Sequence, residues 1–181
     1  MGAIEIQEFR RRLAEDLAYD TSRKAFHEQY EWLEAYFSEK FDKNGFEKFC
    51  ITYNDFYWGI DELREIARGF ASLDPVGNSK MNNVPSENIV QATYFLKYKC
   101  NLYKNIEVDS VAAEIEEADK WNKSAFEALL LIIRQIRNNL FHGKKMELAE
   151  SQYERNKILI TLAASATKII LDNLISAESS T

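Results

Sequence analysis

The chain has 181 residues, of which 46% are hydrophobic and 29% are charged, and its formal net charge is −6. This length and composition suit a folded domain with its own hydrophobic core, and they exclude a disordered or low-complexity chain. The negative net charge excludes a protein that coats nucleic acid through bulk charge. Any phosphate-binding site must therefore be local.

The cysteine and hydropathy patterns indicate the compartment. Cys50 and Cys100 stand alone, without CxxC spacing, which argues against a disulfide framework or a zinc knuckle and favours buried apolar roles. The longest apolar run, residues 128–133, has six residues, whereas a membrane-spanning helix needs about 20. The first residues lack the basic and then apolar plan of a signal peptide. We expect a soluble cytoplasmic protein with no membrane partner.

Helical periodicity recurs along nearly the whole chain, and no alternating stretch is bounded by hairpin turns. The spacing of apolar residues predicts helices, in chain order, over residues 6–17, 26–41, 46–70, 86–103, 111–121, 124–142 and 147–176. The fold class is therefore all-α. We expect a single domain over residues 1–176, an up-and-down bundle of about five to seven helices, followed by a disordered tail at 177–181.

Turn residues set the breaks between the predicted helices. Asn44 and Gly45 are predicted to end the helix over 26–41. The long stripe that follows is predicted to bend near Asn54 or Gly59, because both residue types weaken a helix interior. Residues 73–85 contain both prolines of the chain and form the clearest loop.

The helix over 124–142 has the clearest boundaries. Ser124 and Glu127 have the spacing of a capping box, in which the hydroxyl and the carboxylate each satisfy an otherwise unpaired amide. Apolar residues from Leu129 to Leu140 fall on one face. Gly143 is well placed to end the helix in the left-handed conformation. A second long helix follows it and reaches the end of the predicted domain.

A polar cluster occupies the last turns of this helix. Residues 128–146 include four basic side chains and no acidic one, so this segment carries +4 while the rest of the chain carries −10. A basic spot on an acidic body favours phosphate binding. At about 100° per residue, Arg134, Asn138 and His142 lie within about 80° of one another, and Arg137 lies at the edge of that face.

These residue types support a specific chemistry, and they also have a purely structural explanation. A histidine that titrates near neutral pH takes or gives a proton, and an arginine beside it holds a phosphate and stabilises developing charge. Helix capping and the helix dipole, however, place basic residues, a histidine and a glycine at a helix end without any function. Spacing alone leaves both interpretations open.

The residues themselves add a resemblance. Arg137 and Asn138 are followed by His142, with four residues between the arginine and the histidine, and then by Gly143 and Lys144. This segment closely resembles the signature of the HEPN superfamily (higher eukaryotes and prokaryotes nucleotide-binding), in which four to six residues separate an arginine from a histidine near a helix end. The resemblance extends over about residues 124–174, and the first 85 residues add only compatible helices.

The resemblance implies an HEPN-like helical bundle that forms a homodimer and acts as a metal-independent endoribonuclease in a toxin or phage-defence role. The active site is then shared by two copies of the motif helix, and no metal or other cofactor is needed. The RNA 2′-hydroxyl attacks the adjacent phosphorus and the 5′-oxygen leaves, which gives a 2′,3′-cyclic phosphate. The implied roles are general acid or base for His142, phosphate holding for Arg137, orientation for Asn138, and contacts to flanking phosphates for Arg134, Lys144, Lys145 and Arg155.

Two other hypotheses remain at this point. The chain could be a non-catalytic HEPN module that binds a nucleotide or RNA, such as the helical partner of a nucleotidyltransferase, or it could be a purely structural bundle. A toxin of this kind would also have an antitoxin partner. Aromatic residues at 53 and 56–58 could stack on bases, but their helical spacing favours core packing.

Overall fold

The computed structural model describes residues 3–73, 87–100, 102, 108–142 and 150–181, and it describes side chains over 21–73, 87–100, 102, 109–138 and 155–181. All regular secondary structure in these segments is helical, which confirms the all-α prediction. The elements are α1 Ala3–Phe41, η1 Asp42–Asn44, α2 Gly45–Trp58, α3 Asp61–Leu73, α4 Glu87–Lys99, η2 Val108–Val111, α5 Ala112–Asp119, α6 Ala125–His142, α7 Glu150–Asp172 and α8 Leu174–Ser179.

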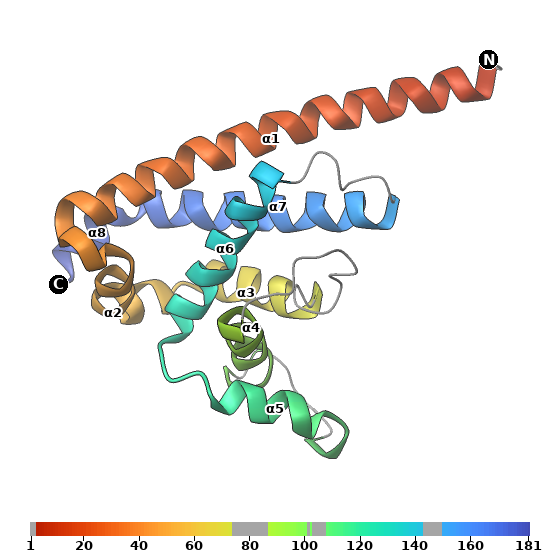
Figure 1. The fold of residues 1–181 in the computed structure, drawn as a ribbon. Helices are drawn as coiled ribbons and strands as arrows, with labels where there is room; N and C mark the ends of the chain where they lie inside the picture. The colour runs from red at the N-terminus through yellow and green to blue at the C-terminus, as the bar shows by residue number, and fades with distance from the viewer. Residues whose placement is uncertain (1–2, 74–86, 101, 103–107, 143–149) are drawn as a thin grey trace.

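The helices do not form a simple up-and-down bundle. The two longest, α1 and α7, lie side by side and run in the same direction (Figure 1), and α6 crosses them steeply. Helices α2 and α4 pack against the lower part of α6, and α5 packs on α4. The predicted up-and-down topology is therefore wrong, because the neighbouring helices α1 and α7 are parallel and α6 crosses them. None of the described helices is long and apolar enough to span a membrane.

The division into helices differs from the predicted one at three places. The helix expected over 147–176 is divided at Asn173 into α7 and α8. The separate helices expected over 6–17 and 26–41 are one continuous helix, α1, because the residues between them include no glycine or proline to stop it. The single stripe expected over 46–70 is divided into α2 and α3. The break lies at Gly59, one of the two positions at which a bend is predicted.

Gly45 allows α2 to start directly against the end of α1. A Cβ atom at this position would overlap the backbone carbonyl of Phe37. Asp42, the first residue of the short helix η1 between α1 and α2, has a φ of 61°. Residues other than glycine rarely adopt this backbone conformation. Asn44 and Gly45 thus mark the end of a helix as predicted, and Gly45 also begins the next one.

Aromatic side chains dominate the core where α1, α2 and α6 meet. The ring of Phe49 is fully buried and lies 4.7 Å from the ring of Phe37, 4.9 Å from Tyr53 and 5.9 Å from Phe126, measured between centroids. Tyr57 is also buried, and its hydroxyl donates to the carbonyl of Ile170 at 2.9 Å. Tyr53 and Tyr57 therefore pack the core, and they do not form a surface for stacking bases.

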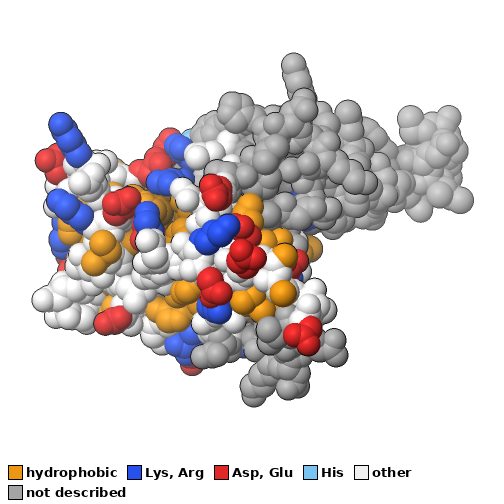
Figure 2. Space-filling model, turned by 60° about the horizontal axis from the view of Figure 1, so that its bottom comes forward, with side chains coloured by type: hydrophobic (Ala, Val, Ile, Leu, Met, Phe, Trp, Pro, Cys, Tyr) orange, Lys and Arg blue, Asp and Glu red, His pale blue; other side chains and the backbone are white. Residues whose placement is uncertain are grey.

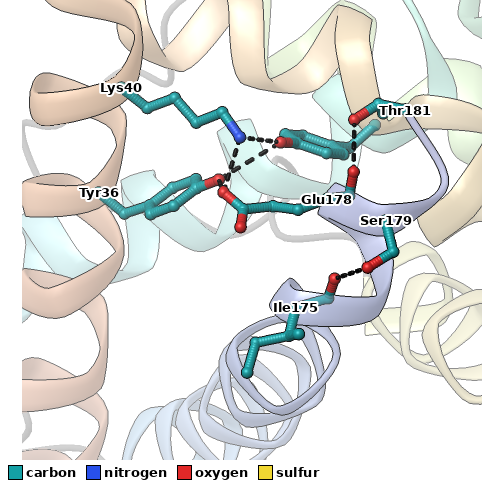
Figure 3. A network of polar contacts seen from close by, with 7 residues as sticks. Tyr36, Lys40, Ile175, Glu178, Ser179 and Thr181 are labelled. Carbon is teal, nitrogen blue, oxygen red and sulfur yellow. Dashed lines mark hydrogen bonds and ion pairs between the residues drawn. The ribbon is translucent and has the colours of Figure 1, made fainter.

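The sequence predicts a disordered tail at 177–181, and the structure places residues 177–179 of this segment in a short helix. Helix α8 covers Leu174–Ser179, and Ala177 is fully buried. Glu178 accepts hydrogen bonds from Lys40 Nζ at 2.6 Å and from the hydroxyl of Tyr36, and Lys40 also donates to the hydroxyl of Tyr53 at 2.8 Å (Figure 3). A small side chain facing the core and one salt bridge to α1 hold this short helix in place.

The contacts of Glu178 make the attachment of α8 depend on pH. The hydrogen bonds from Lys40 and Tyr36 lower the pKa of Glu178 below its ordinary value. A carboxyl group with a lowered pKa in the folded state stabilises that state above its unfolded pKa, and the stabilisation is lost as the pH falls through the folded pKa. We expect Glu178→Gln to lower Tm modestly at pH 7, since exposed ion pairs contribute little.

Thermal unfolding followed by circular dichroism at pH 7 and at pH 3 checks this expectation. The difference between Glu178→Gln and the wild type should shrink as the pH falls, because the wild-type carboxylate gains a proton as the pH passes through its lowered folded-state pKa. Glu39→Gln serves as the control, because Glu39 is an exposed carboxylate on the same helix as Lys40. An equal difference in Tm at both pH values would show that the charge of Glu178 does not hold α8.

Candidate nucleic-acid interface on helix α6

Helix α6 begins where the capping box predicts. The backbone N–H of Glu127 donates to Ser124 Oγ at 3.0 Å, which satisfies one of the amides that a helix start leaves without an intrahelical partner. The last helical residue is His142. The predicted stop at Gly143 lies outside the described residues.

One face of α6 belongs to the core. Leu129, Ile132, Ile133 and Ile136 are each at most 8% exposed, and they pack with residues of the neighbouring helices in a single hydrophobic cluster. These are the residues that the apolar spacing predicted. The burial of this face fixes the rotation of α6, and so it determines which residues the opposite face presents.

A second face of α6 carries polar residues toward solvent. Glu127, Leu131, Arg134 and Asn138 follow one another at steps of four, three and four residues, a spacing that places them on one side of a helix. Their exposure increases along the helix, from the buried Glu127 through the half-buried Arg134 to the exposed Asn138. A further step of four reaches His142, whose side chain lies outside the described part of the chain.

Arg137 faces helix α1 from the edge of this surface. Its Nη2 lies 3.4 Å from Glu34 Oε2, and its guanidinium lies 5.7 Å from the centre of the Tyr30 ring. Its Nη1 donates to Asn138 Oδ1 at 3.4 Å. The Arg137 side chain is 21% exposed, so it is fixed between the two helices with only part of the guanidinium accessible.

Tyr30 lies beneath the guanidinium of Arg137. Its side chain is fully buried. Burial raises the pKa of Tyr30 most strongly, with a further increase from Glu34, while Arg134 and Arg137 act in the opposite direction. The phenol therefore stays neutral at physiological pH. It supports the Arg137 guanidinium as an aromatic face and contributes no charge.

Arg134 faces away from α1 and borders a pocket. Its guanidinium lies 4.3 Å from the centre of the Phe46 ring, within the range of a cation–π contact. The pocket beside it has a volume of about 310 Å³ and is lined by Lys43, Asn44, Phe46, Glu47, Asn88, Trp121, Lys123, Glu127, Leu131 and Arg134. No spacing rule applied to the sequence could reveal this pocket, because its walls come from several helices.

The surface charge around the described side chains is mixed. Figure 2 shows basic and acidic side chains interspersed over one face of the molecule, with hydrophobic side chains between them. The coloured side chains in this view do not form one large patch of a single sign. This distribution agrees with the exclusion of bulk-charge coating and leaves local sites as the places where a phosphate would bind.

The predicted site residues fall into three groups. Arg134, Arg137 and Asn138 lie together in the last turns of α6, as expected from their spacing. Arg155 lies half-buried on α7. The side chains of His142, Lys144 and Lys145 lie outside the described residues, so their predicted roles stay predictions. Glu34 is the residue of this region that the sequence analysis missed.

Comparisons with known proteins leave the resemblance to the motif as the only link to a family. A scan against protein-family models, a search of curated proteins and a search of solved structures found no significant match for this chain.

Proposed function

We propose that this chain is an endoribonuclease of the HEPN type that cleaves RNA without a metal, at a site formed between two copies of α6. The observation that carries the proposal is the grouping of the partly exposed Arg137 and the exposed Asn138 in α6, one turn before His142 in the sequence. A cation, an amide and an imidazole on neighbouring turns are the groups that phosphodiester cleavage by an internal nucleophile requires.

Each residue has a defined step in this reaction. An imidazole of His142 takes the proton of the RNA 2′-hydroxyl as its oxygen attacks phosphorus, or gives a proton to the departing 5′-oxygen. Arg137 binds the phosphate and stabilises the charge that develops on it. Its contacts with Glu34 and Tyr30 hold the guanidinium in one orientation, so less conformational freedom is lost when the phosphate binds. Asn138 orients the phosphate or the sugar.

A second copy of the chain completes this arrangement. One motif supplies a single histidine, whereas the reaction needs a base for the 2′-hydroxyl and an acid for the leaving oxygen. Two copies of α6 related by a twofold axis supply two histidines and two arginines around one phosphate. We therefore propose a homodimer in which the C-terminal ends of the two copies of α6 face each other.

The decisive experiment incubates the purified protein with single-stranded RNA in excess EDTA. We expect cleavage, with 2′,3′-cyclic phosphate ends identified by mass spectrometry. The cleavage rate per chain should rise with protein concentration in parallel with the dimer fraction measured by light scattering. A monomer that cleaves RNA at full rate would contradict the shared site, and intact RNA at all concentrations would contradict the nuclease itself.

Arg137→Lys tests whether the shape of the guanidinium matters as well as its charge. Lysine keeps the positive charge but cannot make the paired N–H contacts of arginine, so we expect at least about a tenfold loss of cleavage rate, with the larger loss in Arg137→Ala. Initial rates on one fluorescent RNA measure both. Arg68→Lys is the matched control, since Arg68 is an arginine on α3 that pairs with Glu65. Equal rates for Arg137→Lys and wild type would show that a simple positive charge suffices.

A binding module is the second candidate, and the Arg137–Glu34 ion pair favours it. A carboxylate 3.4 Å from the guanidinium competes with a phosphate for the same cation. In that case the protein retains RNA or a nucleotide in a filter-binding assay, and the RNA ends stay unchanged in EDTA. The incubation with RNA in EDTA thus distinguishes the two functions, because only the nuclease gives RNA with 2′,3′-cyclic phosphate ends.

The proposed biological role is that of a toxin or a phage-defence effector, held in check by an antitoxin or a nucleotidyltransferase partner. Expression of the wild-type chain should then arrest growth through RNA cleavage. Expression of His142→Ala to the same level should not. Equal growth arrest by both proteins would show that the toxicity does not depend on His142.

A further inference from the structure

The pocket beside Arg134 has the size and lining of a small-molecule site. Its volume of about 310 Å³ falls at the lower end of the range for ligand pockets. Its walls come from the start of α2, the start of α4, the segment between α5 and α6, and α6 itself. Rigid helices therefore shape most of it.

Glu127 is a buried carboxylate that faces the cations of Lys123 and Arg134. Its side chain lines the pocket, and the residue is 3% exposed. Lys123 Nζ lies 3.6 Å from Glu127 Oε1 and also 3.5 Å from Glu47 Oε1, so the two carboxylates share this cation. Burial raises the pKa of Glu127 above its ordinary value. A buried carboxylate in this position favours a ligand that offers N–H donors.

The other walls suit an aromatic ring that carries a phosphate. Trp121 is 8% exposed, and its indole N–H already donates to the carbonyl of Ser124 at 3.2 Å, so it offers the pocket a ring surface more than a donor. Lys43, Lys123 and Arg134 bring three cations to the lining, against the carboxylates of Glu47 and Glu127. An aromatic base with an anionic phosphate satisfies both features.

We propose that this pocket binds a guanine nucleotide, with the base edge on Glu127, the ring against Trp121 and the phosphate near Lys43 and Arg134. Guanine presents a ring N–H and an amino group side by side, and both can donate to one carboxylate. The matching edges of adenine, cytosine and uracil place an acceptor next to each donor, and that acceptor would face the carboxylate oxygens. The buried Glu127 thus selects guanine over the other bases.

The pocket lies on the face of α6 that carries Arg134 and, four residues further along, Asn138, and its role as an RNA subsite rests on the proposed function. Arg134 borders the pocket eight residues before His142, which is about 12 Å along a helix at 1.5 Å per residue. One RNA strand along α6 could therefore have a guanine in the pocket and, on its 5′ or 3′ side, a phosphate beside Arg137.

Calorimetric titration of the wild-type protein with guanosine, adenosine, cytidine and uridine 5′-monophosphates tests the pocket. We expect saturable binding of the guanine nucleotide, at least about tenfold tighter than of the others. Glu127→Gln should weaken that binding by about ten- to hundredfold. Glu116→Gln, an exposed carboxylate on α5, should leave it unchanged. Absence of binding by the guanine nucleotide, or equal binding by Glu127→Gln with its Tm preserved, would overturn the proposal.

Two further experiments complete the test. The first distinguishes a failure of the pocket from a failure of the nuclease, and the second distinguishes a free nucleotide from RNA as the ligand of the pocket. His142→Ala should bind the guanine nucleotide as the wild type does, so a protein that binds it without cutting RNA contradicts only the proposed function. RNA cleavage without any guanine binding overturns only the pocket. Replacing guanosine by inosine, which lacks the amino group, should slow cleavage of a short RNA at least about tenfold. An unchanged rate would overturn the RNA subsite and assign the pocket to the free nucleotide.

Discussion

Replacement of His142 by alanine is expected to lower the rate of RNA cleavage by at least about 100-fold, because a positioned acid or base contributes about 10²- to 10⁴-fold to a proton transfer. The fold should persist. His142 is the last residue of α6, and the apolar face that fixes the helix in the core lies at earlier turns. Initial rates on one RNA in EDTA, together with thermal unfolding of both proteins, measure the two expectations.

The chain offers a matched control for this substitution. His27 is the other histidine, and its Nε2 lies 3.0 Å from Glu31 on helix α1. His27→Ala should therefore cleave RNA at the wild-type rate. If His142→Ala retains full activity, or if His27→Ala loses activity to the same extent, the assignment of the general acid or base to the end of α6 is wrong.

Replacement of Phe49 by alanine is expected to lower the free energy of unfolding by about 3–5 kcal/mol, the usual cost of removing a buried aromatic ring from a core. Phe49 is fully buried, and its ring lies within 5.9 Å of the rings of Phe37, Tyr57 and Phe126. Removing it leaves a cavity where α1, α2 and α6 meet, so every one of these helices loses contacts. Urea unfolding followed by circular dichroism measures the change.

Ile51→Ala is the control for this prediction. Ile51 lies two residues further along α2, and it is 71% exposed, so its removal should change the free energy of unfolding by less than about 0.5 kcal/mol. A loss below about 1 kcal/mol for Phe49→Ala would mean that the core relaxes into the vacant space. The aromatic cluster would then not be what holds α6 against α1 and α2.

The features that the sequence predicted correctly are local ones. The start of α6 follows from Ser124 and Glu127, which lie within one turn of each other, and its buried face follows from the spacing of Leu129 to Ile136. Tyr53 and Tyr57 were likewise assigned to the core from their spacing. In each case the feature depends only on residues that are close together in the sequence.

The features that were missed depend on distant parts of the chain. Glu178 looks like a solvated tail residue until Lys40, far away in sequence, lies beside it. Glu34 has no spacing relation to Arg137, and only the packing of α1 against α6 brings them together. The pocket beside Arg134 likewise requires the arrangement of several helices. Periodicity predicts which face of a helix is buried, but it does not predict which helix covers that face.

Cleavage of matched RNA and DNA strands in EDTA tests the proposed mechanism most directly. The nucleophile in this mechanism is the 2′-hydroxyl, so an RNA strand should be cut to 2′,3′-cyclic phosphate ends. The DNA strand of the same sequence should stay intact, as should an RNA with a single 2′-deoxynucleotide at the cleaved position. Equal cleavage of RNA and DNA, or cleavage of RNA that appears only when Mg²⁺ is added, would contradict a metal-independent site built from Arg137 and His142.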